Sequence, residues 1–254
     1  MEIGFANNPR KNILDEIEWI GRNGFDFVDL FLEEDQAVPE KIDIRKIREL
    51  LKTYGLGVVG HTAWYLPVGS PVPSLRDAAI SEMQRYFVYF SKLTVPYVTI
   101  HANWPPRMFS TKEGIDFQVG TLRKLVESAK KHDISLMYEP VDTCHDSIES
   151  VSEILQSVPN LYLHLDIGHA HLFGRRPEQF INKFHDRLKH IHANDNDGNR
   201  DLHIPLGAGT IDWENVIKCL KQYYDGTITL EIFSRDRDYV LLCKEKLEKW
   251  WKSL

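Results

Sequence analysis

Two hydrophobic patterns alternate along the whole chain. Short apolar runs with little polar alternation are typical of parallel strands that helices cover on their outer face. Between them lie longer segments in which apolar residues recur at steps of three and four, as on one face of a helix. The segment 114–131 is an example, with Ile115, Val119, Leu122, Leu125, Val126 and Ala129.

This alternation predicts eight strand–helix pairs. The expected strands are 2–5, 26–31, 57–61, 96–101, 134–139, 161–166, 188–193 and 226–231. The expected helices are 11–23, 41–54, 75–93, 114–131, 147–157, 177–185, 213–223 and 236–252. Eight parallel strands close a barrel, so the pattern predicts an α/β fold of the (β/α)8 TIM-barrel type. Because the chain has 254 residues, we expect 1–254 to form one such barrel as a single domain.

Composition narrows the class of protein further. The formal net charge of −6 indicates a soluble protein and gives no support for a broad nucleic-acid-binding surface, although a local basic patch remains compatible with it. The start MEIGFANNPR lacks the apolar stretch of a signal peptide, and no apolar run approaches the ~20 residues that span a membrane. Three widely spaced cysteines fit reduced thiols. We therefore expect a cytoplasmic protein with no membrane partner; a homo-oligomer is compatible with the sequence.

Seven strand-like runs end in, or are closely followed by, a side chain that is able to bind a metal. These side chains are His61, His101, Glu139, Asp166, His169, His192, Asp201, His203 and Glu231. Polar residues at the C-terminal strand ends describe the mouth of a barrel, where such enzymes place their chemistry. Imidazoles and carboxylates together are the ligand set of Zn²⁺, Mn²⁺ and similar divalent ions.

Taken singly, each candidate has a simpler explanation. A histidine at a strand end is usually only hydrogen-bonded, and carboxylates on separate strands can serve as a general acid and base without a metal. The coincidence of six such residues on six strands favours a metal, because buried carboxylates that close would repel one another without a cation.

A second layer is expected below these residues, since side chains two positions apart on a strand share a face. It comprises Val59, Thr99, Met137, His164, His190 and Thr229. Two of these are histidines rather than core residues. Either they orient Asp166 and His192 by hydrogen bonds, or they are core histidines that satisfy each other or bind water.

The proline-rich loops 61–75 and 102–113 both follow strand ends. They carry Trp64, Tyr65 and Trp104, which either form walls of a substrate pocket or only pack the barrel rim.

Three segments carry a family resemblance that extends over nearly the whole chain: LDIGHAH at 165–171, HIHANDNDGNRDLHIPLGAGTIDW at 190–213 and LE at 230–231. The chain resembles the xylose isomerase-like barrel superfamily, which includes sugar isomerases and epimerases and the abasic-site nuclease endonuclease IV. The resemblance implies that Glu139, Asp166, His192 and Glu231 hold one catalytic metal. In relatives of the endonuclease IV type it implies up to three zinc ions, with His61, His101, His169, Asp201 and His203 as further ligands.

The resemblance favours an enzyme that isomerises or epimerises a small sugar or sugar phosphate with a divalent zinc, manganese, cobalt or magnesium cofactor, using one to three ions. Glu139 and Glu231 would exchange the proton with substrate carbon. His169 and Arg200, with Trp64 and Trp104, would bind the substrate.

Three alternatives remain at this stage. The first is an endonuclease IV-like zinc phosphodiesterase (AP endonuclease family 2), the only one that has nucleic acid as a partner. A metal-dependent lyase or dehydratase is the second, and a non-catalytic sugar-binding barrel the third. The acidic total weighs against the nuclease. So does the small number of basic residues in the mouth loops: Arg107, Lys112, Arg175, Arg176, Arg200, Arg235 and Arg237.

Overall fold

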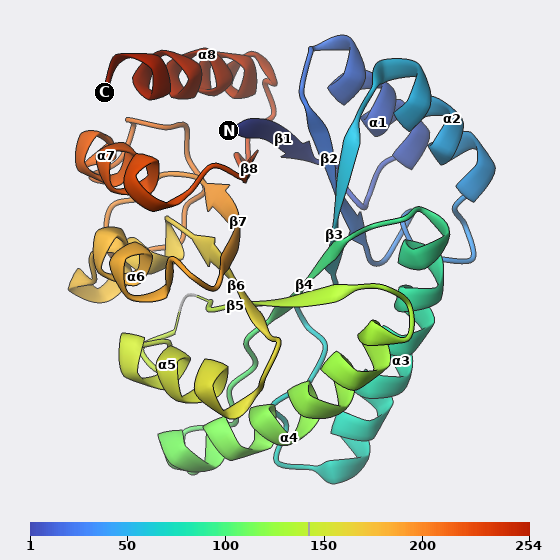
Figure 1. Ribbon diagram of the computed structural model, residues 1–254, viewed down its shortest axis with the longest axis vertical. Coiled ribbons are helices and arrows are strands. Elements are labelled where there is room, and N and C mark those ends of the chain that lie inside the picture. Colours follow the sequence, from blue (N-terminus) through green and yellow to red (C-terminus); the bar gives the residue numbers. More distant parts are fainter. Residues whose placement is uncertain (142) are drawn as a thin grey trace.

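The eight expected strands close into a parallel barrel in chain order, as predicted (Figure 1). The computed structural model describes residues 1–141 and 143–254. The strands are β1 (Glu2–Ala6), β2 (Phe27–Leu32), β3 (Gly57–Thr62), β4 (Tyr97–His101), β5 (Ser135–Glu139), β6 (Tyr162–Asp166), β7 (Leu188–Ala193) and β8 (Thr227–Leu230). Closure pairs β8 with β1, so none of these strands is left at an open edge.

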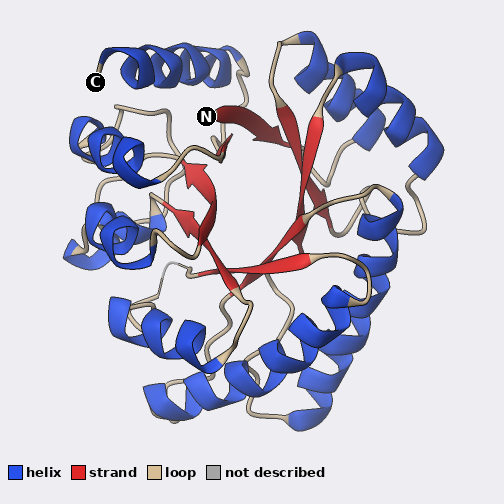
Figure 2. Ribbon diagram, in the orientation of Figure 1, coloured by secondary structure: helices blue, strands red, loops and turns tan. Residues whose placement is uncertain are grey.

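Helices surround the barrel, drawn in blue around the red strands in Figure 2, and the described residues form eight α-helices. They are α1 (Ile13–Arg22), α2 (Ile44–Tyr54), α3 (Pro73–Lys92), α4 (Thr111–Lys130), α5 (Ile148–Ser157), α6 (Pro177–Phe184), α7 (Trp213–Tyr223) and α8 (Asp238–Ser253). The expected ranges are confirmed to within three residues at each end. The differences have local causes: α3 begins at a proline, and α4 begins earlier because Ser110 and Glu113 form a capping box.

One helical element was not expected. A 3-10 helix, η1 (His169–Gly174), follows β6 directly and is interrupted at Leu172 and Phe173. It is too short to produce an apolar periodicity, so the hydrophobic pattern could not predict it.

The core lies mainly between barrel and helices. Outward-facing strand residues such as Val28, Ile100 and Tyr138 are fully buried against the helix ring. Inside the barrel a smaller apolar cluster of Phe27, Val59 and Met137 fills the amino-terminal half. The remaining interior is polar, which is unusual for a packed barrel and marks the carboxyl-terminal end as the functional one.

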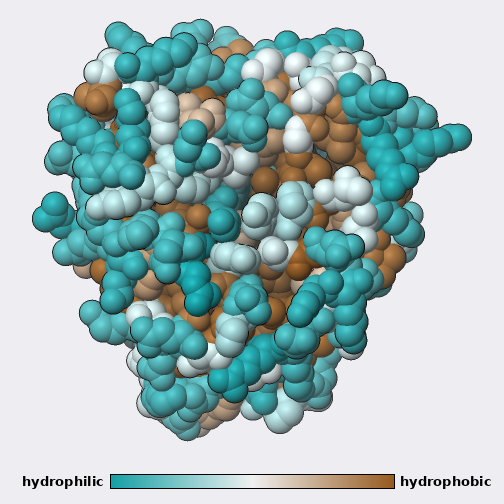
Figure 3. Space-filling model, viewed as in Figure 1, coloured by the Kyte–Doolittle hydropathy of each residue, from teal (hydrophilic) through white to brown (hydrophobic). Residues whose placement is uncertain are grey.

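On the face seen in Figure 3, hydrophilic residues dominate the periphery, and hydrophobic side chains become visible toward the middle. Across the described residues, none of the helices combines the length and apolarity that a membrane span requires.

Candidate metal centre

Strand register brings the expected ligands to one level of the barrel. Across β4 and β5, His101 is the partner of Glu139, and across β6 and β7, Asp166 is the partner of His192. Glu231 follows the end of β8, where its backbone N–H donates to the carbonyl of Ala193 on β7. Because the carboxyl ends of parallel strands meet at one rim, these side chains project into the same space.

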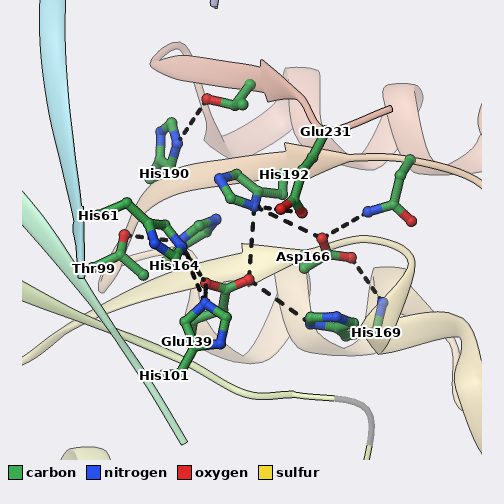
Figure 4. A network of polar contacts seen from close by, with 12 residues as sticks. His61, Thr99, His101, Glu139, His164, Asp166, His169, His190, His192 and Glu231 are labelled. Atoms are coloured by element: carbon green, nitrogen blue, oxygen red, sulfur yellow. Dashed lines mark hydrogen bonds and ion pairs between the residues drawn. The ribbon is translucent and has the colours of Figure 1, made fainter. Parts of the chain in front are cut away.

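Three carboxylates converge on one nitrogen of His192 (Figure 4). The Nδ1 atom lies 3.0 Å from Glu231 Oε2, 3.7 Å from Glu139 Oε1 and 3.9 Å from Asp166 Oδ2. All four side chains are buried. This is the four-residue set that the sequence predicted for a single metal ion.

His61 and His101 extend this group on the side of β3 and β4. Their Nε2 atoms lie 3.2 Å and 2.9 Å from Glu139 Oε2, and 3.0 Å from each other. Two imidazoles that share one carboxylate oxygen form an arrangement suited to a second ion.

His169, Asp201 and His203 form a third group on the other side. Asp201 Oδ2 lies 3.4 Å from His169 Nε2 and 2.9 Å from His203 Nε2, and His203 Nδ1 lies 3.3 Å from Glu231 Oε2. His203 has a φ of 47°, a left-handed conformation that residues other than glycine seldom adopt. All nine predicted residues are thus linked by contacts shorter than 4 Å.

The charges in this cluster depend strongly on one another. Burial alone would raise the pKa of Glu139 and of Glu231, but the surrounding histidines hold both well below the usual range. Burial raises the pKa of Asp166 to about 6 against the lowering effect of His169 and His203. Burial opposes the charged form of His203 too, yet Glu231 and Asp201 raise its pKa to about 12. In the protein without a metal ion, positive charge on the imidazoles therefore balances the negative charge of the carboxylates.

These residues fit a divalent cation. Several three- and four-residue groups in the cluster have ligand atoms within 4.8 Å of one another, among them Glu139, Asp166 and His169. Asp201 Oδ1 is a buried oxygen with no hydrogen-bond partner among the residues described. A buried acceptor of this kind normally has a partner, and a cation would provide one.

His164 and His190, one layer below the candidate ligands, contact other partners than the sequence led us to expect. His164 Nδ1 lies 2.9 Å from Thr99 Oγ1 and 3.3 Å from Glu139 Oε2, not against Asp166. His190 Nε2 contacts Thr229 and a residue that the sequence analysis did not consider, Asp29 on β2. The two histidine rings also meet edge to face, with centroids 4.6 Å apart. Val59 and Met137 are buried there as expected.

Sequence reasoning missed four residues that hold the cluster in place. Asp29 contacts His192 Nε2, and Asn194 donates to Asp166 Oδ2 at 2.7 Å. Phe31 stacks on the His61 ring with centroids 3.8 Å apart, and Phe233 stacks on His203 at 4.2 Å. Only Asp29 had a visible signal, as a lone carboxylate within the apolar run of β2.

The loop from 194 to 213 is organised around the carboxylate of Asp195. It accepts hydrogen bonds from the backbone N–H groups of Gly207 and Ile211 and from the indole of Trp213. The backbone N–H of Asp195 donates to the carbonyl of Ile204, and the N–H of Ile204 donates to the carbonyl of Asp195. This buried anchor fixes the loop that carries Asp201 and His203.

A cavity of about 620 Å³ opens beside the cluster of nine candidate ligands. Its wall includes His61, His101 and Glu231, together with Phe31 and Trp64. Trp64 is 62% exposed, so most of its side chain is open to solvent. A hollow of about 920 Å³ at the amino-terminal end of the barrel contains none of the nine predicted ligands.

The other expected substrate-binding residues lie elsewhere. The Trp104 indole donates to buried Asp146, which favours the rim-packing interpretation. Arg200 is exposed and binds Asp197 within its own loop, and His169 lies against Asp201 in the cluster of candidate ligands. Conversely, the cavity wall contains two basic residues that the sequence count overlooked, Arg10 and Lys11, besides Arg235 and Arg237.

The model of the xylose isomerase-like TIM barrel family matches residues 17–254. The chain belongs to this family. The resemblance inferred from the sequence motifs is thereby confirmed.

Two curated relatives cover most of the chain. An uncharacterized protein of Methanocaldococcus jannaschii is 27% identical over 248 residues, which span 87% of this chain and 79% of the relative. A probable L-ribulose-5-phosphate 3-epimerase of Mycoplasma pneumoniae is 22% identical over 242 residues, 87% of this chain and 77% of the relative.

Two solved structures match over almost their full lengths. A D-tagatose 3-epimerase-like protein is 26% identical, with a TM-score of 0.89, covering 99% of this chain and 97% of that one. The IolI protein with a bound zinc atom has a TM-score of 0.81 and 19% identity over 99% of this chain and 95% of its own, and this likeness shows the fold alone. Sugar epimerases are thus prominent among the relatives and structural neighbours with named activities.

Proposed function

We propose that this protein is a metal-dependent enzyme that epimerises or isomerises a small sugar or sugar phosphate by proton transfer at the carbon beside the carbonyl group. The observation that carries the proposal is the convergence of Glu139, Asp166 and Glu231 on His192 Nδ1. Resemblance to proteins named as sugar epimerases supports the reaction class.

Glu139, Asp166, His192 and Glu231 would hold one divalent ion, with zinc, manganese, cobalt and magnesium as candidates. When bound, such an ion supplies positive charge that polarises a substrate carbonyl and lowers the free energy of an enediolate. The other five cluster residues would complete one or two further positions or contact substrate oxygens. The zinc atom in the IolI structure supports zinc as the first ion to test.

Glu139 and Glu231 would move the proton. They come from β5 and from the end of β8, and their carboxylates approach the same His192 nitrogen from different strands. Their low pKa values keep both ionised near neutral pH, so either can act as the base that removes the proton from carbon. Return of the proton by the other glutamate, on the opposite face, would invert the carbon.

The cavity beside Glu231 would hold the rest of the substrate. Trp64 offers an exposed ring for the apolar face of a sugar, while Arg10, Lys11, Arg235 and Arg237 lie on its wall. Two of these guanidinium groups already have acidic neighbours, since Arg237 pairs with Glu16 and Arg10 lies 4.0 Å from Asp35. Free and phosphorylated ketoses should therefore be tested side by side.

A phosphodiesterase of the endonuclease IV type is the second candidate. The observation that favours it is the completeness of the His61–His101 and His169–Asp201–His203 groups, which provides ligands for further ions. In that reaction a hydroxide would attack phosphorus and clustered cations would stabilise the leaving oxygen. A lyase or dehydratase on the same scaffold would use the same residues.

The decisive assay compares these reactions directly. Protein loaded with each metal is incubated with a panel of ketoses and ketose phosphates, and epimer formation is followed by chromatography. A duplex containing one abasic site is tested in parallel. Epimer formation without strand cleavage would support the proposal. Cleavage that is lost in His61→Ala and His203→Ala, with no epimer from any sugar, would replace it by the nuclease.

A further inference from the structure

Asp29 is a buried carboxylate in the middle of β2, a strand that contributes none of the nine predicted ligands. Its side chain is fully enclosed, and one oxygen makes all of its hydrogen-bond contacts. Oδ2 lies 2.7 Å from His192 Nε2, 3.0 Å from Thr229 Oγ1 and 3.2 Å from His190 Nε2. Oδ1 has no hydrogen-bond partner among the residues described.

The short distance to His192 fixes where the histidine carries a proton. An ionised carboxylate can only accept, so an imidazole nitrogen 2.7 Å away must be the N–H donor. With this proton on Nε2, Nδ1 is the ring nitrogen that can release its own proton and offer a lone pair to a cation. Nδ1 is the atom that faces Glu139, Asp166 and Glu231.

The surroundings of Asp29 are built to keep this oxygen in place. Thr229 is the β7–β8 register partner of His192, and its hydroxyl donates to the same Oδ2. A carboxylate enclosed in a barrel costs free energy that an apolar residue would avoid, and packing alone gives no reason for it. Orientation of a ligand through its second ring nitrogen does give a reason.

We propose that Asp29 is a positioning residue that holds His192 in the Nε2–H form and presents Nδ1 to the ion. The inference rests on the proposed function in so far as an ion binds at Nδ1. The hydrogen bond itself is a property of the protein without metal, so the two can be tested separately.

The first test uses the wild-type protein with ¹⁵N-labelled histidine and no metal. We expect a one-bond ¹H–¹⁵N signal from His192 Nε2–H, shifted downfield and protected from exchange by the hydrogen bond to Asp29. The same signal should be lost or moved strongly in Asp29→Asn and in Asp29→Leu. A His192 Nε2 that carries no proton in the wild type would overturn the proposal whatever the variants do.

The second test measures Zn²⁺ affinity by competition with a chromophoric chelator. Asp29→Asn should bind Zn²⁺ about 10- to 100-fold more weakly, as is usual when the partner of a ligating histidine is changed. Asp146→Asn is the matched control, because Asp146 is an equally buried carboxylate that binds Thr143 and Trp104 instead. Its Zn²⁺ affinity should remain near that of the wild type.

The outcomes separate the two proposals. Equal Zn²⁺ affinity in Asp29→Asn and wild type would overturn the positioning role. A loss of the same size in Asp146→Asn would also overturn it, because the effect would then be general to buried carboxylates. If the wild type binds no Zn²⁺ but shows the Nε2–H signal that Asp29→Asn loses, the metal part of the proposed function fails and the hydrogen-bond assignment stands.

Discussion

The two ring nitrogens of His192 have different partners. Nε2 meets Asp29 inside the barrel, and Nδ1 meets three carboxylates at the mouth. Residues at strand ends, such as Glu139 and His192, could be predicted because their position along a short apolar run is visible in the sequence. Asp29 and Asn194 could not be assigned a role, because their importance arises from contacts across the barrel to residues distant in sequence.

At the level of single residues, Glu231→Gln tests the proposed base. The amide keeps the size and one oxygen ligand but cannot accept a proton from carbon, so turnover should fall by about 10²- to 10⁴-fold. Zn²⁺ binding should weaken without being lost. Glu127→Gln on the exposed face of α4 is the control and should leave turnover unchanged. Epimerisation at the wild-type rate in Glu231→Gln would exclude Glu231 as the base.

The pKa shifts predict that metal binding releases protons. Carboxylates nearby raise the pKa of His169 to about 10 and of His203 to about 12 despite burial, so both carry protons at pH 7 in the protein without metal. A bound cation displaces them, and Zn²⁺ affinity should therefore rise with pH through neutrality and fall as pH drops. Titration calorimetry in buffers with different ionisation enthalpies should show about one proton or more released per chain. Identical apparent enthalpies in all buffers would count against histidine ligation.

At the level of elements, helix and strand positions followed from periodicity to within three residues at each end. The turn from β6 into η1 did not, because its geometry depends on a close approach between chain segments. A Cβ atom at Gly168 would lie 2.0 Å from Asn194 Oδ1 and 3.0 Å from Asp166 Oδ1. Its backbone φ of −62° is one that alanine adopts freely, so the constraint is space.

Gly168→Ala should therefore damage the site more than the fold. Moving Asn194 or Asp166 by even a few tenths of an ångström would alter the ligand set, and we expect Zn²⁺ affinity to fall by about tenfold or more, as for other changes next to metal ligands. Gly120→Ala in α4 is the matched control, since nothing lies within 4 Å of its added Cβ. That change should raise the free energy of unfolding by up to about 1 kcal/mol. Unchanged Zn²⁺ affinity in Gly168→Ala would show that the turn accommodates a methyl group without moving the ligands.

At the level of the whole molecule, the ion should stabilise the barrel, because its ligands come from strands that span most of the circumference. With Zn²⁺ at 100 times its Kd, mass action contributes about 2.7 kcal/mol. For a protein of this size that corresponds to a rise in Tm of roughly 5–10 °C. Differential scanning fluorimetry with Zn²⁺ and with excess chelator measures it. Equal Tm values in the two conditions would mean that no ion bridges these strands.

Hydrogen exchange with the solvent tests most directly whether Glu139 and Glu231 exchange a proton with substrate carbon. The metal-loaded protein is incubated in D₂O with free and phosphorylated ketoses, and each sugar is examined by NMR. We predict deuterium at the carbon beside the carbonyl group, dependent on metal and abolished by Glu231→Gln. Absence of deuterium in every sugar, together with cleavage of a duplex at an abasic site, would contradict this prediction.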